Sequence, residues 1–573
     1  MKKVKLFSFA LAALMLGACS SEDGIDNGGQ GTVLPGEKGY ISLAINLPTT
    51  PSTRANDDFD DGLPVEYAVN NATLLIFEGT DEASAKFAGG YDLGTITPNT
   101  VGGNITSTFK VTKEIKKPVN GDLYALVVVN RGDVLTTEDQ GATWKLNGTE
   151  LSALTTLSAF NATAQEIAAE KLYDTTDDGN GFFMTNAPLY SVPGGTVQPS
   201  NGNLSTLTLI NAENVYTTAA EAEANPAASV YVERAVAKVT VNGTNGNLGN
   251  NAGMTYTISG WTFDVTNKKT YLVRNMTDAN TWWNYNVAGD YRFVGSAAVG
   301  PNLYRTYWGV DPNYSSYIAG DFNIFAGQTP ADLNPVNGNG YCLENTFDVD
   351  NQNQNQTTRV IVAATLNAGS TFYILDNDKG KIWSKTEAED AVKAEYLGNQ
   401  AVIAALTANL DGADKKITGD DLTVTFDKAA GDLTVTMIEI SADKAGDFKG
   451  GEIPDALTPG TEANNAILAA VNAGKKVSCY ANGVAYYPVM IRHFDDNQTP
   501  WSNVEYGGNE NNFLGRYGVL RNNWYEINVT GIKDIGYADV PDVYGTPDDP
   551  MESYISVEIN VLSWAKRSQN VEL

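Results

Sequence analysis

Two segments near opposite ends of the chain alternate apolar and polar residues in the same way. The apolar positions of the first are Ile41, Leu43, Ile45 and Leu47, and those of the second are Ile555, Val557, Ile559 and Val561. A period of two places all four apolar side chains on one face of an extended segment, as in a half-buried strand. Because the patterns match, either segment could fill the same position in a sheet. If the first were cut away, the second, from a neighbouring molecule, could replace it.

Short alternating runs between turn residues recur along the rest of the chain, which is typical of β-sandwiches. We expect strands over 73–77, 124–130, 229–241, 270–274, 359–366, 422–426, 433–440, 477–491 and 524–532. Helical spacing is rarer and is found over 149–173, 384–397 and 461–474. Ser384 and Glu387 have the spacing of a capping box at the start of the second helix. The pattern predicts a mainly β fold with a few inserted helices.

The length of 573 residues favours two domains. The Asn/Gly-rich run Asn242 to Gly253 is the predicted boundary, with an N-terminal domain over 55–241 and a C-terminal domain over 254–573. A second spacer is predicted at Asp539 to Pro550, which contains three prolines. Extended, it would reach about 35–40 Å. It would let the last strand leave its own domain, although an ordinary closing loop is the alternative.

The first 18 residues have the form of an export signal. Three lysines precede an apolar run over 6–16 that is too short to span a bilayer comfortably. The sequence Leu16-Gly17-Ala18-Cys19 has the form of a lipobox, so Cys19 is the predicted site of lipid attachment. The chain is therefore expected to be exported as a lipoprotein.

Arg54 lies between the first alternating segment and the first predicted domain. The surrounding residues 49–58 are polar and include Pro51, and such segments stay accessible to proteases. Most single arginines in loops are solvated bystanders, but this position is suited to cleavage between Arg54 and Ala55. Residues 19–54 would then form a propeptide that carries a removable strand.

The net charge of −30 argues against nucleic acid as a partner, since phosphates need Lys and Arg. It equally argues against an anionic membrane surface, and solubility outside the cell explains it. Beside Cys19 the chain has two cysteines, Cys342 and Cys479. Two cysteines do not make a disulfide framework, and both a single bond and two buried thiols remain open.

Candidate catalytic and metal-binding residues are sparse. No HExxH motif, Cys/His cluster or Walker glycine loop is present, so zinc and nucleotide chemistry have no basis and no cofactor is expected. His493, the single histidine, is expected at the surface rather than in a Ser-His-Asp arrangement. Residues 174–181 lack the spacing of a calcium loop and are interpreted as an acidic turn. Their first three residues also fit a short O-glycosylation pattern. We expect no enzyme.

Aromatic residues gather in two short stretches, and they suggest an alternative function. These residues are Trp282, Trp283, Tyr285, Tyr304, Tyr307 and Trp308. Exposed together, they could stack on sugars, as in a non-polymerising surface lipoprotein or tip adhesin that binds glycans or host protein. Packing within the fold is the favoured role for most of them.

Several motifs resemble those of the Bacteroidales fimbrillins, and the end of the chain is similar to the short-fimbrium shaft subunits (type V pilus) in particular. The motifs are the lipobox, the early strand with Thr53-Arg54-Ala55, and the runs 232–239, 344–347, 518–527 and 561–564. The resemblance spans almost the whole chain, while internal loops diverge.

This resemblance implies a fold and a function. Two transthyretin-like β-sandwich domains are implied, together with an outer-membrane lipoprotein precursor that an arginine-specific protease cuts after Arg54. The C-terminal strand of the next subunit, within 551–573 and including Trp564, would fill the vacated groove and so build a surface fimbria that supports adhesion. The implied partners are other copies of the chain, anchor and tip subunits, and host proteins or glycans.

Overall fold

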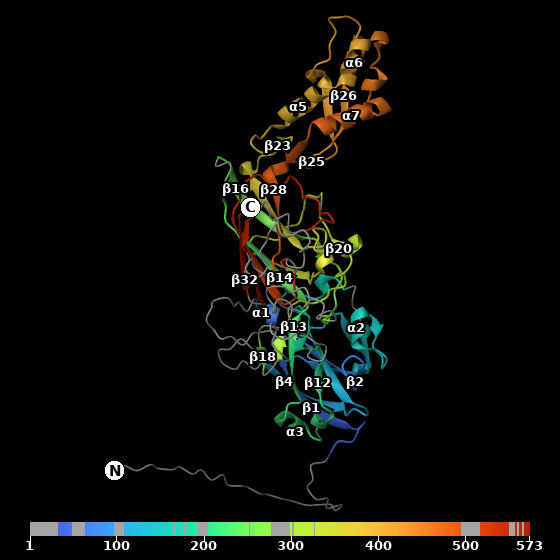
Figure 1. Cartoon of the computed structure of the whole chain (residues 1–573), viewed down its shortest axis with the longest axis vertical. Coiled ribbons are helices and arrows are strands. Elements are labelled where there is room, and N and C mark those ends of the chain that lie inside the picture. The colour runs from blue at the N-terminus through green and yellow to red at the C-terminus, as the bar shows by residue number, and fades with distance from the viewer. Residues whose placement is uncertain are drawn as a thin grey trace, which may run out of the picture.

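The computed structural model shows an elongated molecule in which strands predominate (Figure 1). The mainly β fold expected from the sequence is confirmed. The structure describes residues 32–47, 63–96, 108–163, 167–176, 179–191, 204–250, 253–276, 298–300, 303–306, 308–325, 327–493, 516–548, 556–558, 561–563 and 566–572. Within these ranges, no helix has the length and apolar character needed to cross a membrane.

One large sheet forms the N-terminal part. Its strands lie in the order β3-β2-β5-β9-β13-β1-β4, and β12 also pairs with β5. They are β1 (Lys38–Asn46), β2 (Ala72–Gly79), β3 (Lys86–Gly94), β4 (Thr108–Lys116), β5 (Asp122–Val129), β9 (Met184–Asn186), β12 (Thr208–Ile210) and β13 (Ala228–Arg234). The helices of this part are α1 (Pro64–Tyr67), α2 (Leu157–Thr163) and α3 (Ala219–Ala224). A small sheet joins β6 (Leu135–Glu138), β7 (Thr143–Leu146) and β8 (Thr149–Glu150).

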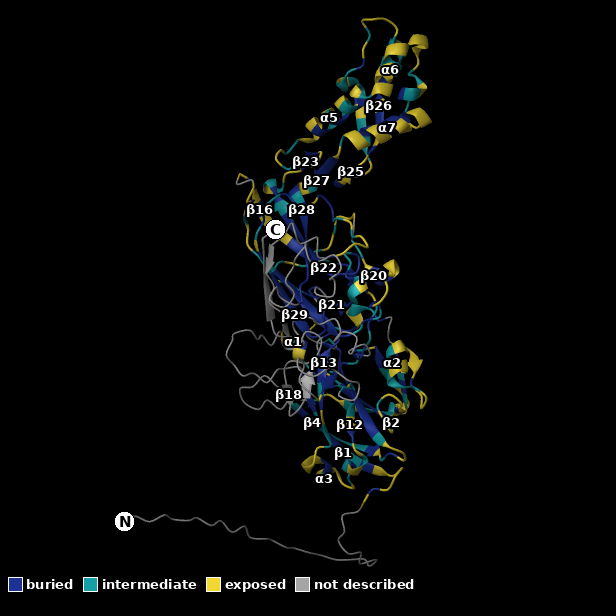
Figure 2. Cartoon of the chain, in the orientation of Figure 1, coloured by how far each residue is buried: buried dark blue, intermediate teal, exposed yellow. Residues whose placement is uncertain are grey.

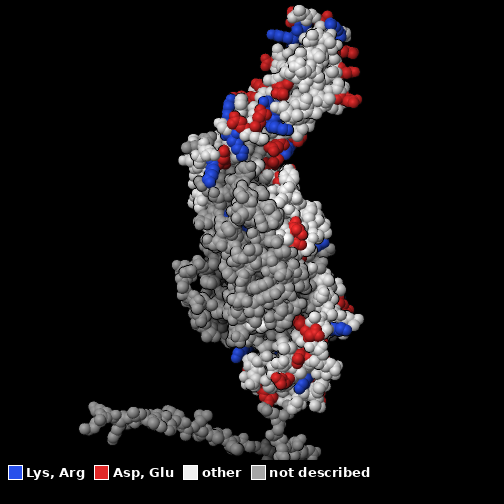
Figure 3. All heavy atoms as spheres, in the orientation of Figure 1, with Lys and Arg blue, Asp and Glu red and all other residues white. Residues whose placement is uncertain are grey.

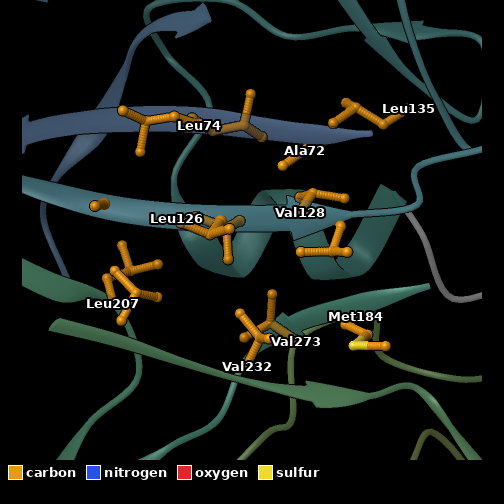
Figure 4. Packing of buried hydrophobic residues seen from close by; sticks show 14 of the residues in the cluster. Ala72, Leu74, Leu126, Val128, Leu135, Met184, Leu207, Val232 and Val273 are labelled. Atoms are coloured by element: carbon orange, nitrogen blue, oxygen red, sulfur yellow. The ribbon is translucent and has the colours of Figure 1, made fainter. Parts of the chain in front are cut away.

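The core of this part takes alternate residues from β1 but consecutive residues from β2 and β5, which are buried on both faces. Figure 4 shows Leu74 of β2, Leu126 of β5 and Val232 of β13 packed in one cluster. Val273, from a much later part of the chain, packs in the same core. The N-terminal core therefore depends on residues beyond the predicted limit at 241.

Two sheets that share one core form the next part. The first contains β21 (Asn339–Leu343), β14 (Val236–Gly243) and β29 (Asn523–Gly531), followed by the C-terminal strands, and the second contains β15 (Gly246–Asn247), β16 (Thr255–Asp264), β22 (Arg359–Leu366) and β28 (Val484–Met490). Val239 and Ile527 of the first sheet belong to the same core cluster as Trp261 and Val362 of the second. Side chains from two facing sheets fill a single core, which is the arrangement of a β-sandwich.

Several short strands border these sheets. β10 (Leu189–Tyr190), β11 (Leu204–Ser205), β18 (Ala298–Gly300) and β19 (Leu303–Arg305) form one small sheet, and β17 (Thr266–Asn267) pairs with β20 (Phe322–Asn323).

The chain passes from the N-terminal sheet to the sandwich at Ala235. The sequence predicted one strand over 229–241, but β13 ends at Arg234 and β14 begins at Val236 in a different sheet. The predicted boundary at 242–253 falls in the connection from β14 to β16, inside the sandwich. The Asn and Gly residues of this segment form turns at the end of a sheet. Composition alone does not distinguish such turns from a linker between two domains.

Residues 372–480 form a third unit that the sequence did not predict as a separate body. It contains β23 (Phe372–Leu375), α5 (Lys385–Gly398), α6 (Gln400–Asn409), β24 (Leu422–Phe426), β25 (Gly431–Leu433), β26 (Val435–Ile440), α7 (Glu462–Gly474) and β27 (Val477–Tyr480). The unit projects from one end of the molecule (Figures 1 and 2). It has its own core, in which Val392, Ile438 and Val471 are buried.

Two of the three predicted helices are confirmed, and one is wrong. The backbone N of Glu387 donates to Ser384 Oγ over 3.3 Å, and the backbone N of Ser384 donates to Glu387 Oε2 over 2.8 Å, so the predicted capping box begins α5. The expected helix over 149–173 is reduced to α2. Leu154 is 77% exposed, so the apolar residues at spacings of three do not form one buried face. The strand expected over 270–274 is absent as well, because this part is irregular.

The extended spacer expected over 539–550 is also wrong where the structure describes it. Val540 is fully buried. Arg359 Nη2 donates to the carbonyl of Pro541 over 2.6 Å, and Thr357 Oγ1 donates to Asp548 Oδ2 over 2.8 Å. Residues 539–548 are therefore a closing loop held against the sandwich.

Candidate functional site: the groove around the first strand

The strand β1 lies inside the N-terminal sheet rather than at its edge. It runs antiparallel to β4 along its whole length, from Lys38 to Asn46. On the other side it runs parallel to β13 from Leu43 to Asn46. Nearer its start, its backbone exchanges two hydrogen bonds with Tyr216, of 2.7 and 2.9 Å. Both backbone edges of β1 are thus paired.

The two faces of β1 are different. Ile41, Leu43, Ile45 and Leu47 are all buried in the N-terminal core, as the alternation predicts. The opposite face carries Tyr40, Ser42, Ala44 and Asn46, and here the helix α3 lies against β1 and β4. Burial of the four apolar side chains contributes roughly 6–12 kcal/mol before ordering costs.

Asn46 holds the end of β1 by buried polar contacts. Its Nδ2 donates to the carbonyl of Val230 on β13 over 3.3 Å, and its Oδ1 accepts from Thr108 Oγ1 on β4 over 2.8 Å. One side chain therefore connects β1 to both neighbouring strands.

An exposed ion pair lies at the other end of β1. Lys38 Nζ is 2.6 Å from Glu114 Oε1, and Tyr40 OH donates to Glu114 Oε2 over 3.3 Å. The hydrogen bond from Lys38 lowers the pKa of Glu114, and the same bond raises the pKa of Lys38. Because the pair is exposed to water, it contributes little to stability.

A sheet with β1 removed would be left with two unpaired inner edges. The backbone of β4 and the facing backbone of residues 216 and 227–231 would lose their hydrogen-bond partners, and the N-terminal core would open on one side. A buried donor or acceptor left unsatisfied costs about 1–3 kcal/mol. The space around β1, called the β1 groove below, is therefore suited to hold another strand of similar pattern.

Arg54 and Ala55, and also Cys19, lie outside the described residues. The described chain stops at Leu47 and resumes at Leu63, one residue before α1. Cleavage after Arg54 and lipid attachment to Cys19 thus stay predictions.

Glu66 of α1 fixes the start of the chain that follows the predicted cleavage site. Its side chain is fully buried, and Lys238 Nζ of β14 lies 2.8 Å from Glu66 Oε1. Tyr341 OH of β21 donates to the same carboxylate over 2.5 Å. The Lys238 ammonium also lies 3.6 Å from the ring centroid of Trp524, while Arg234 Nε donates to the Glu66 carbonyl over 2.8 Å. The contacts of Glu66 therefore connect α1 to strands of both the N-terminal sheet and the sandwich.

A second buried ionic cluster joins β13 to residues near β21 and β29. Arg274 Nε is 3.1 Å from Glu233 Oε1 and 3.6 Å from Glu344 Oε2. Arg521 Nε is 3.4 Å from Glu344 Oε1, and Asn522 Oδ1 accepts from the backbone N of Arg234 over 3.2 Å. The runs 232–239, 344–347 and 518–527, which carry the fimbrillin resemblance, thus meet at the passage between the two sheets.

The sequence pattern distinguishes these three runs but predicts no role for their charged residues. The available signal was the presence of Glu233, Arg234 and Lys238 inside an otherwise apolar strand pattern. Charged residues are almost never fully buried unless they are paired.

The C-terminal strands lie on the edge of the sandwich. β32 (Lys566–Glu572) runs parallel to β29, β30 (Ser556–Glu558) pairs with the end of β32, and β31 (Val561–Ser563) pairs with β29 at Ser563. The sequence predicted one strand through 554–561, whereas the described residues there form two short strands. Val557 belongs to β30 and Val561 to β31. Ile555, Ile559 and Trp564 lie outside the described residues.

The remaining candidate residues have structural roles where they are described. His493 is fully buried, not exposed as expected, and its Nδ1 lies 2.9 Å from Tyr525 OH. Cys342 and Cys479 are free and buried, and burial raises the pKa of both thiols. Asp174 Oδ1 accepts from the backbone N of Thr176 over 3.0 Å, as in an acidic turn. In the described ranges, no group of acidic, His or Cys side chains could hold a metal ion.

Of the six residues in the two aromatic stretches, only Trp308 has a side chain that the structure describes. Trp308 is fully buried, while Trp282, Trp283, Tyr285 and Tyr307 lie outside the described residues. Acidic and basic side chains are interspersed on the described part of the face in Figure 3. That visible area has no continuous basic surface of the kind that binds phosphates.

One family matches the chain by sequence. Residues 478–570 match the model of the fimbrillin C-terminal region, described as "Major fimbrial subunit protein type IV, Fimbrillin, C-terminal". The matched residues include β28, β29 and the C-terminal strands. This match confirms the fimbrillin resemblance over the C-terminal residues that it covers. No curated protein matches the chain by sequence.

Solved structures from Bacteroidales are also similar. A fimbrilin from Porphyromonas gingivalis is 13% identical, covering 93% of this chain and 97% of its own, with a TM-score of 0.32. A candidate cell adhesion protein from Parabacteroides distasonis is 14% identical over 94% and 99% of the two chains, with a TM-score of 0.33. Another from Bacteroides eggerthii is 13% identical over 95% and 100%, with a TM-score of 0.32. Because these scores are low, we draw no functional conclusion from them.

Proposed function

We propose that this chain is a structural subunit of a surface fimbria that polymerises by strand exchange. The precursor is exported as an outer-membrane lipoprotein through Cys19 and is cut between Arg54 and Ala55 by an arginine-specific protease. The C-terminal strand of a second copy, from residues 551–573, then fills the β1 groove. One observation carries the proposal: β1, which precedes Arg54 in the sequence, is an inner strand of the N-terminal sheet.

The geometry of β1 explains why exchange would follow cleavage. While β1 is present, both neighbouring strands are satisfied and the precursor has no open inner edge. Loss of β1 exposes main-chain groups that give affinity to an incoming strand, and the apolar sites of Ile41, Leu43 and Ile45 select its side chains. Each subunit offers one groove and one strand. Such a head-to-tail contact does not close on itself and therefore generates filaments.

This mode of assembly determines which partners the chain requires. The proposal requires other copies of the chain, an arginine-specific protease, and anchor and tip subunits at the ends of the filament. Host proteins or glycans are the proposed targets of adhesion, and neither catalysis nor a cofactor is part of the proposal.

Limited digestion with a trypsin-like protease tests the proposal directly. The wild-type precursor is expected to change from a monomer to a ladder of polymers on a gel, because cleavage after Arg54 frees the groove. An Arg54→Ala precursor, treated in parallel, is expected to remain monomeric. A ladder from the Arg54→Ala protein, or a cleaved wild-type protein that stays monomeric at high concentration, would refute the proposal.

A cavity variant in β1 distinguishes the precursor from the mature subunit. Leu43→Ala is expected to destabilise the precursor by about 2–5 kcal/mol, since Leu43 is buried in the core. After cleavage the variant residue has left with the propeptide, so the polymer should melt as the wild type does. Thermal melting before and after digestion measures this difference. An equal loss in both forms would mean that β1 stays in the mature subunit.

A further inference from the structure

The strand β1 and the C-terminal segment share more than a pattern. Residues 40–47 read Tyr-Ile-Ser-Leu-Ala-Ile-Asn-Leu, and residues 554–561 read Tyr-Ile-Ser-Val-Glu-Ile-Asn-Val. The Tyr, both Ile, the Ser and the Asn are identical at matching places. Leu43 and Leu47 are replaced by the smaller Val557 and Val561, and Ala44 is replaced by Glu558.

We propose that residues 554–561 of a second copy occupy the β1 groove in the register of residues 40–47, and that Glu558 pairs with Lys110 to select this register. The inference rests on the strand exchange proposed above and adds to it a residue-by-residue fit and a specificity-determining ion pair.

The shared polar residues support this register. Asn46 bonds to Val230 and Thr108 on the two sides of the groove, and Asn560 would make the same two bonds. Tyr40 donates to Glu114, and Tyr554 would replace it. A shift of one residue would send these polar groups to the core face and the apolar residues to the outer face.

Lys110 distinguishes the incoming segment from β1. In the precursor, Lys110 of β4 lies directly opposite Ala44, so the two side chains share the outer face. The side chain of Lys110 is exposed, and no hydrogen bond or ion pair joins its ammonium to another described residue. Side chains directly opposite in an antiparallel pair have Cβ atoms about 4.5–5.5 Å apart. Glu558 at the place of Ala44 would therefore reach the Lys110 ammonium.

The residue before Tyr554 shows where the match between residues 554–561 and the β1 groove begins. The same register would bring Ser553 to the place of Gly39, where a Cβ atom would lie 2.6 Å from Val215 Cγ1 and 2.9 Å from the Tyr216 carbonyl. The fit therefore begins at Tyr554. In the donating copy, Asp548 is held by Thr357, which leaves five residues, 549–553, to reach at most about 17 Å. So short a connection fixes the distance between successive subunits.

Charge reversal in the full-length chain tests the proposed pair. After digestion, Glu558→Lys and Lys110→Glu are each expected to slow ladder formation about ten-fold, since each places like charges opposite one another at every junction. The double variant, Glu558→Lys with Lys110→Glu, is expected to regain most of the wild-type rate. The losses should shrink as salt is raised, because the pair is exposed.

Glu452→Lys is the matched control, since it makes the same charge change at an exposed residue of the unit 372–480, outside the β1 groove. It is expected to leave the rate within about two-fold of the wild type. Three results would overturn the register while wild-type ladders still form: single reversals without effect, a double variant as slow as the singles, or a larger effect of Glu452→Lys. If the wild type forms no ladder, the strand-exchange proposal itself fails. If the wild type instead closes its own tail into the groove, it stays monomeric after digestion and both proposals fail.

Discussion

Lys238→Met is expected to lower the free energy of unfolding by about 3–5 kcal/mol, because it leaves the carboxylate of Glu66 buried without its charged partner. Glu66 and Lys238 have side chains that are 0% and 1% exposed, so water cannot replace the lost contact. The ammonium also packs on the ring of Trp524, and this interaction would be lost as well. Thermal and denaturant unfolding of the precursor measures the effect.

Two further variants test whether burial of the Glu66–Lys238 pair, rather than the loss of any charge, causes the destabilisation. Lys415→Met removes an ion pair of 2.6 Å whose side chains are 39% and 20% exposed, and it should cost less than about 1 kcal/mol. Adding Glu66→Gln to Lys238→Met should restore much of the stability, because the amide is uncharged and can still accept from Tyr341. If Lys415→Met is as damaging as Lys238→Met, burial of the pair is not the reason for the loss.

The position of Glu66 gives this pair a role in the proposed maturation. Glu66 lies twelve residues after Arg54 in the sequence, so the new N-terminal end would be fixed to strands of both sheets after β1 has left. In the proposed fibre, tension would pass through each subunit from the β1 groove in the N-terminal sheet to the C-terminal tail on the sandwich. The buried clusters around Lys238 and Arg274 lie at the passage between these two bodies, where the chain crosses at Ala235.

The sequence predicted the elements whose pattern is local. The strict alternation around Leu43 gave the position and the buried face of β1. The Ser384 and Glu387 pair gave the start of α5, and Thr461 similarly precedes α7. These elements are recognisable because their side chains bond within a few residues or face one core.

Where the predictions were wrong, contacts between distant residues decide the structure. The loop 539–548 reads as a spacer, but Arg359 and Thr357 bind it to the sandwich. The sequence predicted no helix over residues 400–409, where the structure has α6. The apolar run there lacks the spacing that marks a buried face, and Val402 is the one residue of α6 buried in the core. The strand 229–241 was predicted as one element because nothing in its pattern marks the change of sheet at Ala235. His493 was expected outside, yet its hydroxyl partner Tyr525 makes burial possible.

Deletion of residues 551–573 is expected to abolish ladder formation after digestion, because the truncated subunit can accept a strand but has none to donate. Mixed with wild-type precursor before digestion, it should end growing filaments, so the mean ladder length should fall as its share rises. The same deletion combined with Arg54→Ala can neither accept nor donate and should leave wild-type ladders unchanged.

The deletion also removes β32 from the edge of the sandwich, so a point variant must accompany it. Ile559→Asp keeps the whole tail and places a carboxylate at the site that Ile45 occupies in the core, where burial of an unpaired charge costs several kcal/mol. It should block donation, and the melting temperature of the precursor shows whether the variant folds as the wild type does. Gel ladders and electron microscopy measure both variants, and long fibres from either one would mean that another part of the chain connects the subunits.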